Sequence, residues 1–145
     1  MPKTILKSNS AFVGIGNPLS IPKTRQRTNL LTTSEEFNSS YWTVVRTPVP
    51  TPNVAVSPNG SNTADKLIAN TDTNNHRIDR ESITLELSIV YTFSIYAKAG
   101  EYSGLALGVG AAVSQLVDYS LAGSGSVTRT SAGASGTIQQ LSNGW

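Results

Sequence analysis

The sequence contains no cysteine, few charged residues and no long apolar run. Without cysteine, neither disulfide bonds nor thiolate–metal sites can stabilise the fold, so stability must come from burial, backbone hydrogen bonds or association with other chains. No apolar stretch approaches the roughly 20 residues that cross a membrane. No apolar segment of signal-peptide length accompanies Lys3 and Lys7. We therefore expect no membrane partner.

Acidic residues are missing from positions 1–29, which carry a charge of +5, whereas the remainder has six basic and nine acidic residues and a charge of −3. Glycine and proline interrupt short apolar patches in this stretch. These features predict an extended arm, residues 1–28, that docks onto an acidic partner surface; a solvated tail is the open alternative. The residues predicted to anchor the arm are Phe12, Val13, Ile15, Lys23, Arg25 and Arg27.

Nucleic acid is not the expected partner of this arm. Lys23, Arg25 and Arg27 alternate and would share one side of an extended chain. However, Phe12 is the only aromatic residue of the arm, and the body that follows is acidic. Acidic patches on other proteins suit the arm better.

Residues 83–99 show the most regular pattern in the chain. Every odd position is apolar and most even positions are polar, which is the period of a strand with one buried face. β-branched and aromatic side chains fill the pattern, as a pleated surface prefers. Because strands usually hold about 3–10 residues, we expect a turn or bend near residues 86–89. The other strands should pack on the odd-numbered face.

Proline is confined to positions up to 58, so the second half of the chain is free to form ladders. A helical turn is expected at 34–37, a polyproline-like segment at 48–52 and tight turns at 57–60, 123–125 and 143–144. The pattern predicts an all-β fold, a jelly-roll-like antiparallel β-sandwich over residues 29–145. Besides the central stretch, strands are expected at 41–45, 54–56, 63–68, 105–109, 113–121, 127–130 and 137–141.

Exposed aromatic residues are the candidate binding residues, because sugar sites of β-sandwiches combine an aromatic platform with polar side chains. Tyr96 is the first candidate, since it holds an even, outward position in the central stretch. Tyr102 and Trp42 are further candidates, and Tyr41 and Tyr119 also qualify. The alternative is that Trp42 belongs to the core and that Tyr96 packs under a second sheet or a neighbouring subunit.

No catalytic constellation is visible, so the sequence predicts a protein that is not an enzyme and has no cofactor or metal. His76 is the only histidine, and no nucleophile elbow accompanies it. Glu81 and Glu86 would face opposite sides of one strand, against the geometry of a glycosidase pair. A structural calcium site without EF-hand spacing is the weaker alternative, with four candidate ligands: Asp65, Asp72, Asp79 and Glu81.

Four segments in order resemble a known domain: NLLTTSEEFNSSYW, SPNGSNTADKL, YTFSIYAKAGEYSGLAL and GTIQQLSNGW. Together they resemble a jelly-roll domain, similar to carbohydrate-binding modules, of tailed-phage virion surface proteins. The resemblance covers residues 29–145. It implies a structural protein of the virion, either a tail fibre or a capsid decoration, anchored by its arm and acting through assembly and adhesion. Other phage virion proteins would be its partners.

The resemblance also bears on the oligomeric state. In that family further strands usually follow the position of Trp145, so this chain is either a short version or the front part of a longer protein. In a short version an open sheet edge would remain, and such an edge pairs readily with another chain. The resemblance therefore implies a homo-oligomer, a trimer. The alternative function is a carbohydrate-binding module for a host surface polysaccharide.

Overall fold

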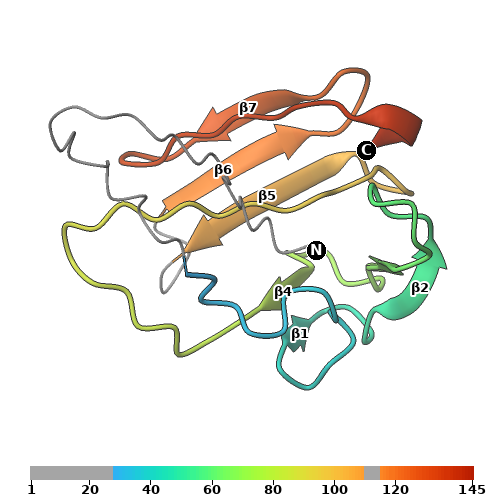
Figure 1. The fold of residues 1–145 in the computed structure, drawn as a ribbon, viewed down its shortest axis with the longest axis horizontal. Coiled ribbons are helices and arrows are strands. Elements are labelled where there is room, and N and C mark those ends of the chain that lie inside the picture. Colours follow the sequence, from blue (N-terminus) through green and yellow to red (C-terminus); the bar gives the residue numbers. More distant parts are fainter. Residues whose placement is uncertain (1–27, 110–114) are drawn as a thin grey trace, which may run out of the picture. The chain divides into compact units, whose positions relative to one another are not determined.

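The computed structural model describes residues 28–109 and 115–145. They belong to two units, one ending at Thr84 and the other spanning Leu85–Trp145. The regular elements are seven strands and one short 3-10 helix, and every strand pair is antiparallel (Figure 1). This confirms the prediction of an all-β chain with antiparallel sheets. The predicted arm residues lie outside the described ranges, in which no helix is long and apolar enough to cross a membrane.

Two small antiparallel ladders make up the first unit. Strand β1 (Thr43–Val45) pairs with β4 (Arg77–Asp79), and β2 (Thr51–Ala55) pairs with β3 (Ala64–Lys66). The expected turn at 57–60 connects β2 to β3. There the Gly60 N–H donates to the Ser57 carbonyl at 2.9 Å, with Gly60 at φ 86°, a backbone region that glycine enters without strain.

Two expectations for the first unit are wrong. Strand β2 begins at Thr51 and therefore earlier than the strand predicted at 54–56. It includes Pro52, which belongs to the segment predicted to be polyproline-like. A proline is tolerated there because the strand is an edge and its register is irregular between Thr51 and Ala55. The helical turn predicted at 34–37 is absent; the Phe37 N–H donates instead to the Asp65 carboxylate at 3.0 Å.

The second unit contains a three-stranded sheet with β6 in the middle (Figure 1). Its strands confirm the strands predicted at 105–109 and 127–130. They also confirm the strand predicted at 113–121 over the residues that the structure describes. The expected turn at 123–125 joins the last two strands, with the Gly125 N–H donating to the Ala122 carbonyl. The strands are β5 (Gly104–Val109), β6 (Gln115–Ser120) and β7 (Ser126–Thr130).

The strand predicted at 137–141 is not formed. A Cβ added to Gly136 would lie 2.5 Å from both Val117 Cγ1 and Tyr119 Oη, two side chains on one face of β6. The backbone at Gly136 therefore lies against the face of the sheet and not at its edge, where it could join the ladder. The chain then forms a 3-10 turn, η1 (Ser142–Gly144), in agreement with the turn expected at 143–144.

The central prediction, a strand over 83–99 with a buried odd-numbered face, is wrong. No ladder includes these residues, and Leu85, Leu87 and Phe93 are all exposed, Leu87 at 94%. The turn expected near 86–89 is confirmed at Leu87 and Ser88, where Ser88 has φ 65°. Alternation specifies an extended backbone with two unlike faces, but it cannot provide a partner strand. Within the described ranges no segment pairs with this one.

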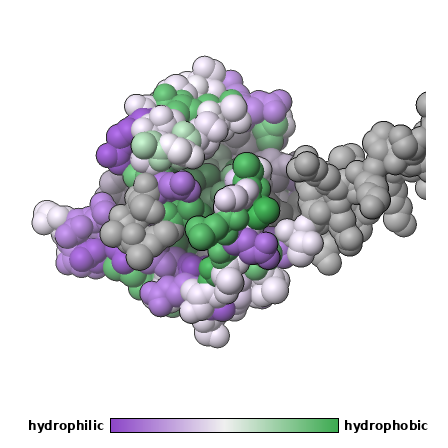
Figure 2. All heavy atoms as spheres, turned by 90° about the vertical axis from the view of Figure 1, so that its left-hand side faces the viewer, coloured by the Kyte–Doolittle hydropathy of each residue, from purple (hydrophilic) through white to green (hydrophobic). Residues whose placement is uncertain are grey.

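The described residues bury little apolar surface. Only two apolar side chains of the described ranges are buried: Val117, at the centre of the three-stranded sheet and 6% exposed, and Pro50 in the first unit. Large apolar residues remain exposed in both units, and hydrophobic atoms reach the surface between polar ones (Figure 2). Soluble monomers seldom leave extensive apolar patches in water. Large apolar side chains therefore remain accessible to water on the described part of the chain.

Candidate functional site

The ladder between β1 and β4 positions the best-defined candidate site in the first unit. Thr43 faces Asp79 in this ladder, so Tyr41 and Arg80, just beyond it, lie at the same end. The Arg80 guanidinium carbon is 4.0 Å from the centre of the Tyr41 ring, and its Nη1 donates to the Tyr41 carbonyl at 3.1 Å. A cation over an aromatic face is attracted by the negative face of the ring. The two contacts together hold Arg80 in one orientation.

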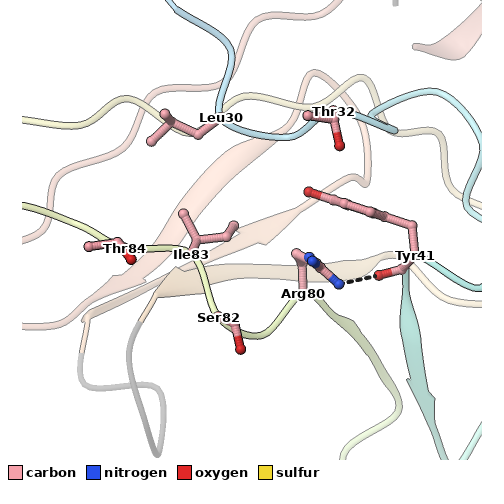
Figure 3. Close-up of a pocket in the computed structure, with 7 residues that line it drawn as sticks. All are labelled: Leu30, Thr32, Tyr41, Arg80, Ser82, Ile83 and Thr84. Atoms are coloured by element: carbon pink, nitrogen blue, oxygen red, sulfur yellow. Dashed lines mark hydrogen bonds between the residues drawn. The ribbon is translucent and has the colours of Figure 1, made fainter.

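A cavity of about 280 Å³ lies beside this pair. Figure 3 shows the Tyr41 ring next to Arg80, with the phenol end of the ring directed toward the side where Leu30 and Ile83 lie. The cavity is close to the smallest size typical of ligand pockets, about 300 Å³. Hydroxyl, guanidinium and aliphatic groups share its lining, which consists of Leu30, Thr32, Tyr41, Arg80, Ser82, Ile83 and Thr84.

Trp42 belongs to an aromatic cluster and not to an exposed platform. Its ring centre lies 5.2 Å from that of Phe37 and 5.3 Å from that of Tyr41, the latter edge-to-face. Its indole N–H donates to the Thr33 carbonyl at 3.0 Å. These contacts leave Trp42 half-buried and favour the structural alternative for this residue.

Tyr96 and Tyr102 are exposed, as a binding role would require. Tyr96 is 47% exposed and Tyr102 66% exposed, and both belong to the second unit. No hydrogen bond or ring contact within the described part of the chain involves either side chain. Trp42, in contrast, belongs to the first unit. The predicted anchoring residues Phe12, Val13, Ile15, Lys23, Arg25 and Arg27 fall outside the described ranges.

Three of the acidic candidates, Asp65, Asp72 and Asp79, and also His76 have structural partners. Asp65 accepts from the N–H groups of Phe37 and Asn53, and Asp79 pairs with Arg77 at 2.6 Å. His76 Nε2 lies 3.0 Å from the Asn70 side-chain oxygen, within a polar loop. Among residues 28–109 and 115–145, no group of three or more histidine and acidic side chains could hold a metal ion. Asp65 acts as a local cross-link between the two segments that it joins.

The sequence did not predict most of the residues that line the cavity. Tyr41 was among the aromatic candidates, but Arg80, Leu30 and Ile83 were not recognised. Arg80 meets Tyr41 only because a three-residue ladder places positions 41 and 80 at the same end. The sequence carries no strong signal for so short a pairing.

No family model matches the chain, and no match was found among curated proteins or solved structures. The function must therefore be inferred from the residues and their geometry.

Proposed function

We propose that the chain is a structural protein of a tailed-phage virion, displayed on the particle surface as a tail fibre or a capsid decoration. It acts by assembly and adhesion and not by catalysis. Residues 1–28 form the anchoring arm, and the antiparallel sheets of residues 29–145 complete a jelly-roll-like sandwich when the protein assembles. Its partners are other virion proteins and further copies of itself.

One observation carries this proposal: the chain exposes an extended apolar segment and buries very little apolar surface of its own. Leu87 and Val90 are 94% and 92% exposed, whereas Val117 and Pro50 are the only buried apolar residues within the described ranges. Burial of apolar surface is the main favourable term in folding and association. A chain with this distribution gains most of its stability in an assembly. The order of the four segments that resemble phage jelly-roll domains supports a virion as that assembly.

The location of the chain on particles tests the proposal. We expect antibodies raised against residues 29–145 to label intact, purified phage particles in electron micrographs at a fixed place. A chain that is absent from purified particles would contradict the virion role. A variant without residues 1–28, expressed in its place, should be made at the same level but lost from particles. If the full chain and the shortened variant were incorporated into particles equally, the anchoring role of the arm would be contradicted.

The same particles distinguish a tail fibre from a capsid decoration. Particles that lack a decoration protein should lose DNA at lower temperature or lower salt, because the capsid lattice loses stabilising contacts. Particles that lack a fibre should keep their heat stability and lose adsorption to the host.

A second candidate function, binding of a host polysaccharide, rests on the cavity beside Tyr41 and Arg80. The cavity combines an aromatic ring, a fixed guanidinium and the hydroxyl groups of Thr32 and Thr84. Guanidinium groups bind carboxylates through paired hydrogen bonds, so an acidic polysaccharide is the ligand class that this lining suits.

A glycan array with the full chain tests this second function. We expect binding to acidic glycans that is lost in Arg80→Ala and kept in Tyr96→Ala, since Tyr96 lies in the other unit. Loss in Tyr96→Ala alone would move the site to the exposed tyrosine. If the chain bound neither acidic nor neutral glycans, the carbohydrate-binding function would be contradicted.

A further inference from the structure

The segment 89–97 is extended, apolar and without a partner strand. It joins β4 to β5 as a coil (Figure 1). No backbone–backbone hydrogen bond connects residues 87–99 to any other described residue. Most of its large side chains lie open to water: Val90 is 92% exposed, and Tyr91, Phe93 and Tyr96 are between 40% and 47% exposed, whereas Ile95 is half-buried.

This combination is unfavourable for a chain in isolation. β-branched and aromatic residues gain stability on a pleated surface with neighbours on both sides, and here they have no such neighbours. An extended backbone with free N–H and C=O groups is also a template for a further strand. The segment therefore has the composition and the backbone of a strand, and no partner strand for it lies within residues 28–109 or 115–145.

The order of residues in the segment suits pairing with itself. When two copies run antiparallel with Thr92 opposite Thr92, Tyr91 faces Phe93 and Ile89 faces Ile95, and each of these pairs occurs twice. Aromatic pairs, aliphatic pairs and Thr–Thr pairs are favourable cross-strand neighbours. Such an arrangement has two-fold symmetry and closes on itself, whereas a parallel in-register arrangement would continue into an open filament.

The exposed area is close to what a stable pair needs. With about 150–250 Å² for a large side chain, the exposed fractions of Ile89, Val90, Tyr91, Phe93 and Tyr96 amount to roughly 400–700 Å² per copy. A standard protein interface buries about 800 Å² per partner. The backbone of the segment and its flanking residues supply the remainder.

We propose that residues 89–97 form an antiparallel β-ladder with the same residues of a second copy of the chain. This inference rests on the proposed assembly function, for which it specifies one partner and one contact. The two can fail separately: a chain that pairs in solution but is absent from particles contradicts the virion role and leaves the pairing intact.

Single cysteines test the pairing, because the natural chain has none. Under mild oxidation, the full-length Thr92→Cys variant should form a covalent dimer, since residue 92 faces itself across the two-fold axis. Ser94→Cys is the matched control from the same segment: its partner position is 90, so two copies of residue 94 are about 13 Å apart. This exceeds the reach of a disulfide, and we expect about tenfold less dimer. Exposed Thr73 provides a second control through Thr73→Cys.

Equal cross-linking of Thr92→Cys and Ser94→Cys would overturn the proposed register and the ordered ladder. The mass of the unmodified protein in solution is an independent test: a dimer is expected at high micromolar concentration, and a monomer or a trimer would contradict two-fold pairing.

Hydrogen exchange then identifies which segment covers residues 89–97. Protection of 89–97 that rises with protein concentration supports a second copy. Protection independent of concentration would show that another segment of the same chain, such as residues 1–28, covers it and would refute the proposal.

Discussion

At the scale of single residues, side chains hold together segments that have few backbone ladders. Asp65 in β3 accepts one N–H from Phe37 and one from Asn53, which are 28 and 12 residues away. Hydrogen bonds to a charged acceptor contribute more than neutral ones. The half-buried carboxylate therefore fixes the loop before β1 and the irregular strand β2 at once.

We expect Asp65→Asn to lower the free energy of unfolding by about 1–2 kcal/mol, because an amide oxygen can replace only one of the two acceptors. Urea denaturation followed by circular dichroism measures the change. Glu81→Gln is the control, since Glu81 is exposed and its side chain has no hydrogen bond to another residue of the described ranges. An equal effect of both substitutions would show that lost charge, and not the two hydrogen bonds, is responsible.

The Arg80–Tyr41 pair is a second residue-scale contact. At an exposed site, a cation over a tyrosine ring contributes about 0.5–1 kcal/mol. A double-mutant cycle of Arg80→Ala and Tyr41→Leu should show coupling of this size in urea denaturation. Arg80→Lys should recover only part of it, because an ammonium cannot also direct a planar donor at the Tyr41 carbonyl. Strict additivity of the two single substitutions would mean that the pair contributes nothing to stability.

At the scale of elements, the strands that the sequence predicted best are those flanked by clear turns. Glycine around positions 104 and 123–125 marked the ends of β5 and β7, and Asn59 with Gly60 marked the turn after β2. Pairing between β1 and β4 could not be predicted, because two three-residue segments carry no recognisable register. The strand prediction for residues 83–99 was wrong for another reason. Its alternation predicts a strand, but no segment of the described chain pairs with it or buries one of its faces.

The close approach of Gly136 to β6 gives an element-scale prediction. Gly136→Ala should destabilise the second unit by about 1–3 kcal/mol, because the new methyl group would overlap Val117 and Tyr119. Gly100→Ala is the matched control: a Cβ there has no atom within 4 Å and the backbone is not in the left-handed region. Thermal unfolding of both variants measures the difference. A neutral Gly136→Ala would mean that residues 136–138 do not pack on the sheet.

At the scale of the whole molecule, the small core predicts that stability depends on protein concentration. If two copies fold as one unit, each tenfold rise in concentration adds about 1.4 kcal/mol to the apparent free energy of unfolding. We expect the denaturation midpoint to rise accordingly. In Tyr91→Asp, which places a charge in the proposed ladder, the midpoint should not change with concentration. A concentration-independent midpoint in the unmodified chain would contradict stabilisation by association.

The turn at Leu87 and Ser88 has a further consequence for digestion by proteases. Proteases bind their substrates as extended backbone, and exposed segments with few hydrogen bonds are cut first. A chymotrypsin-like enzyme that cleaves after large apolar residues should therefore make its earliest cut between Leu87 and Phe93. The fragments would separate the small ladders from the three-stranded sheet. Because the proposed pairing would shield the same peptide bonds, the rate of this first cut would then report how much of the protein is unpaired.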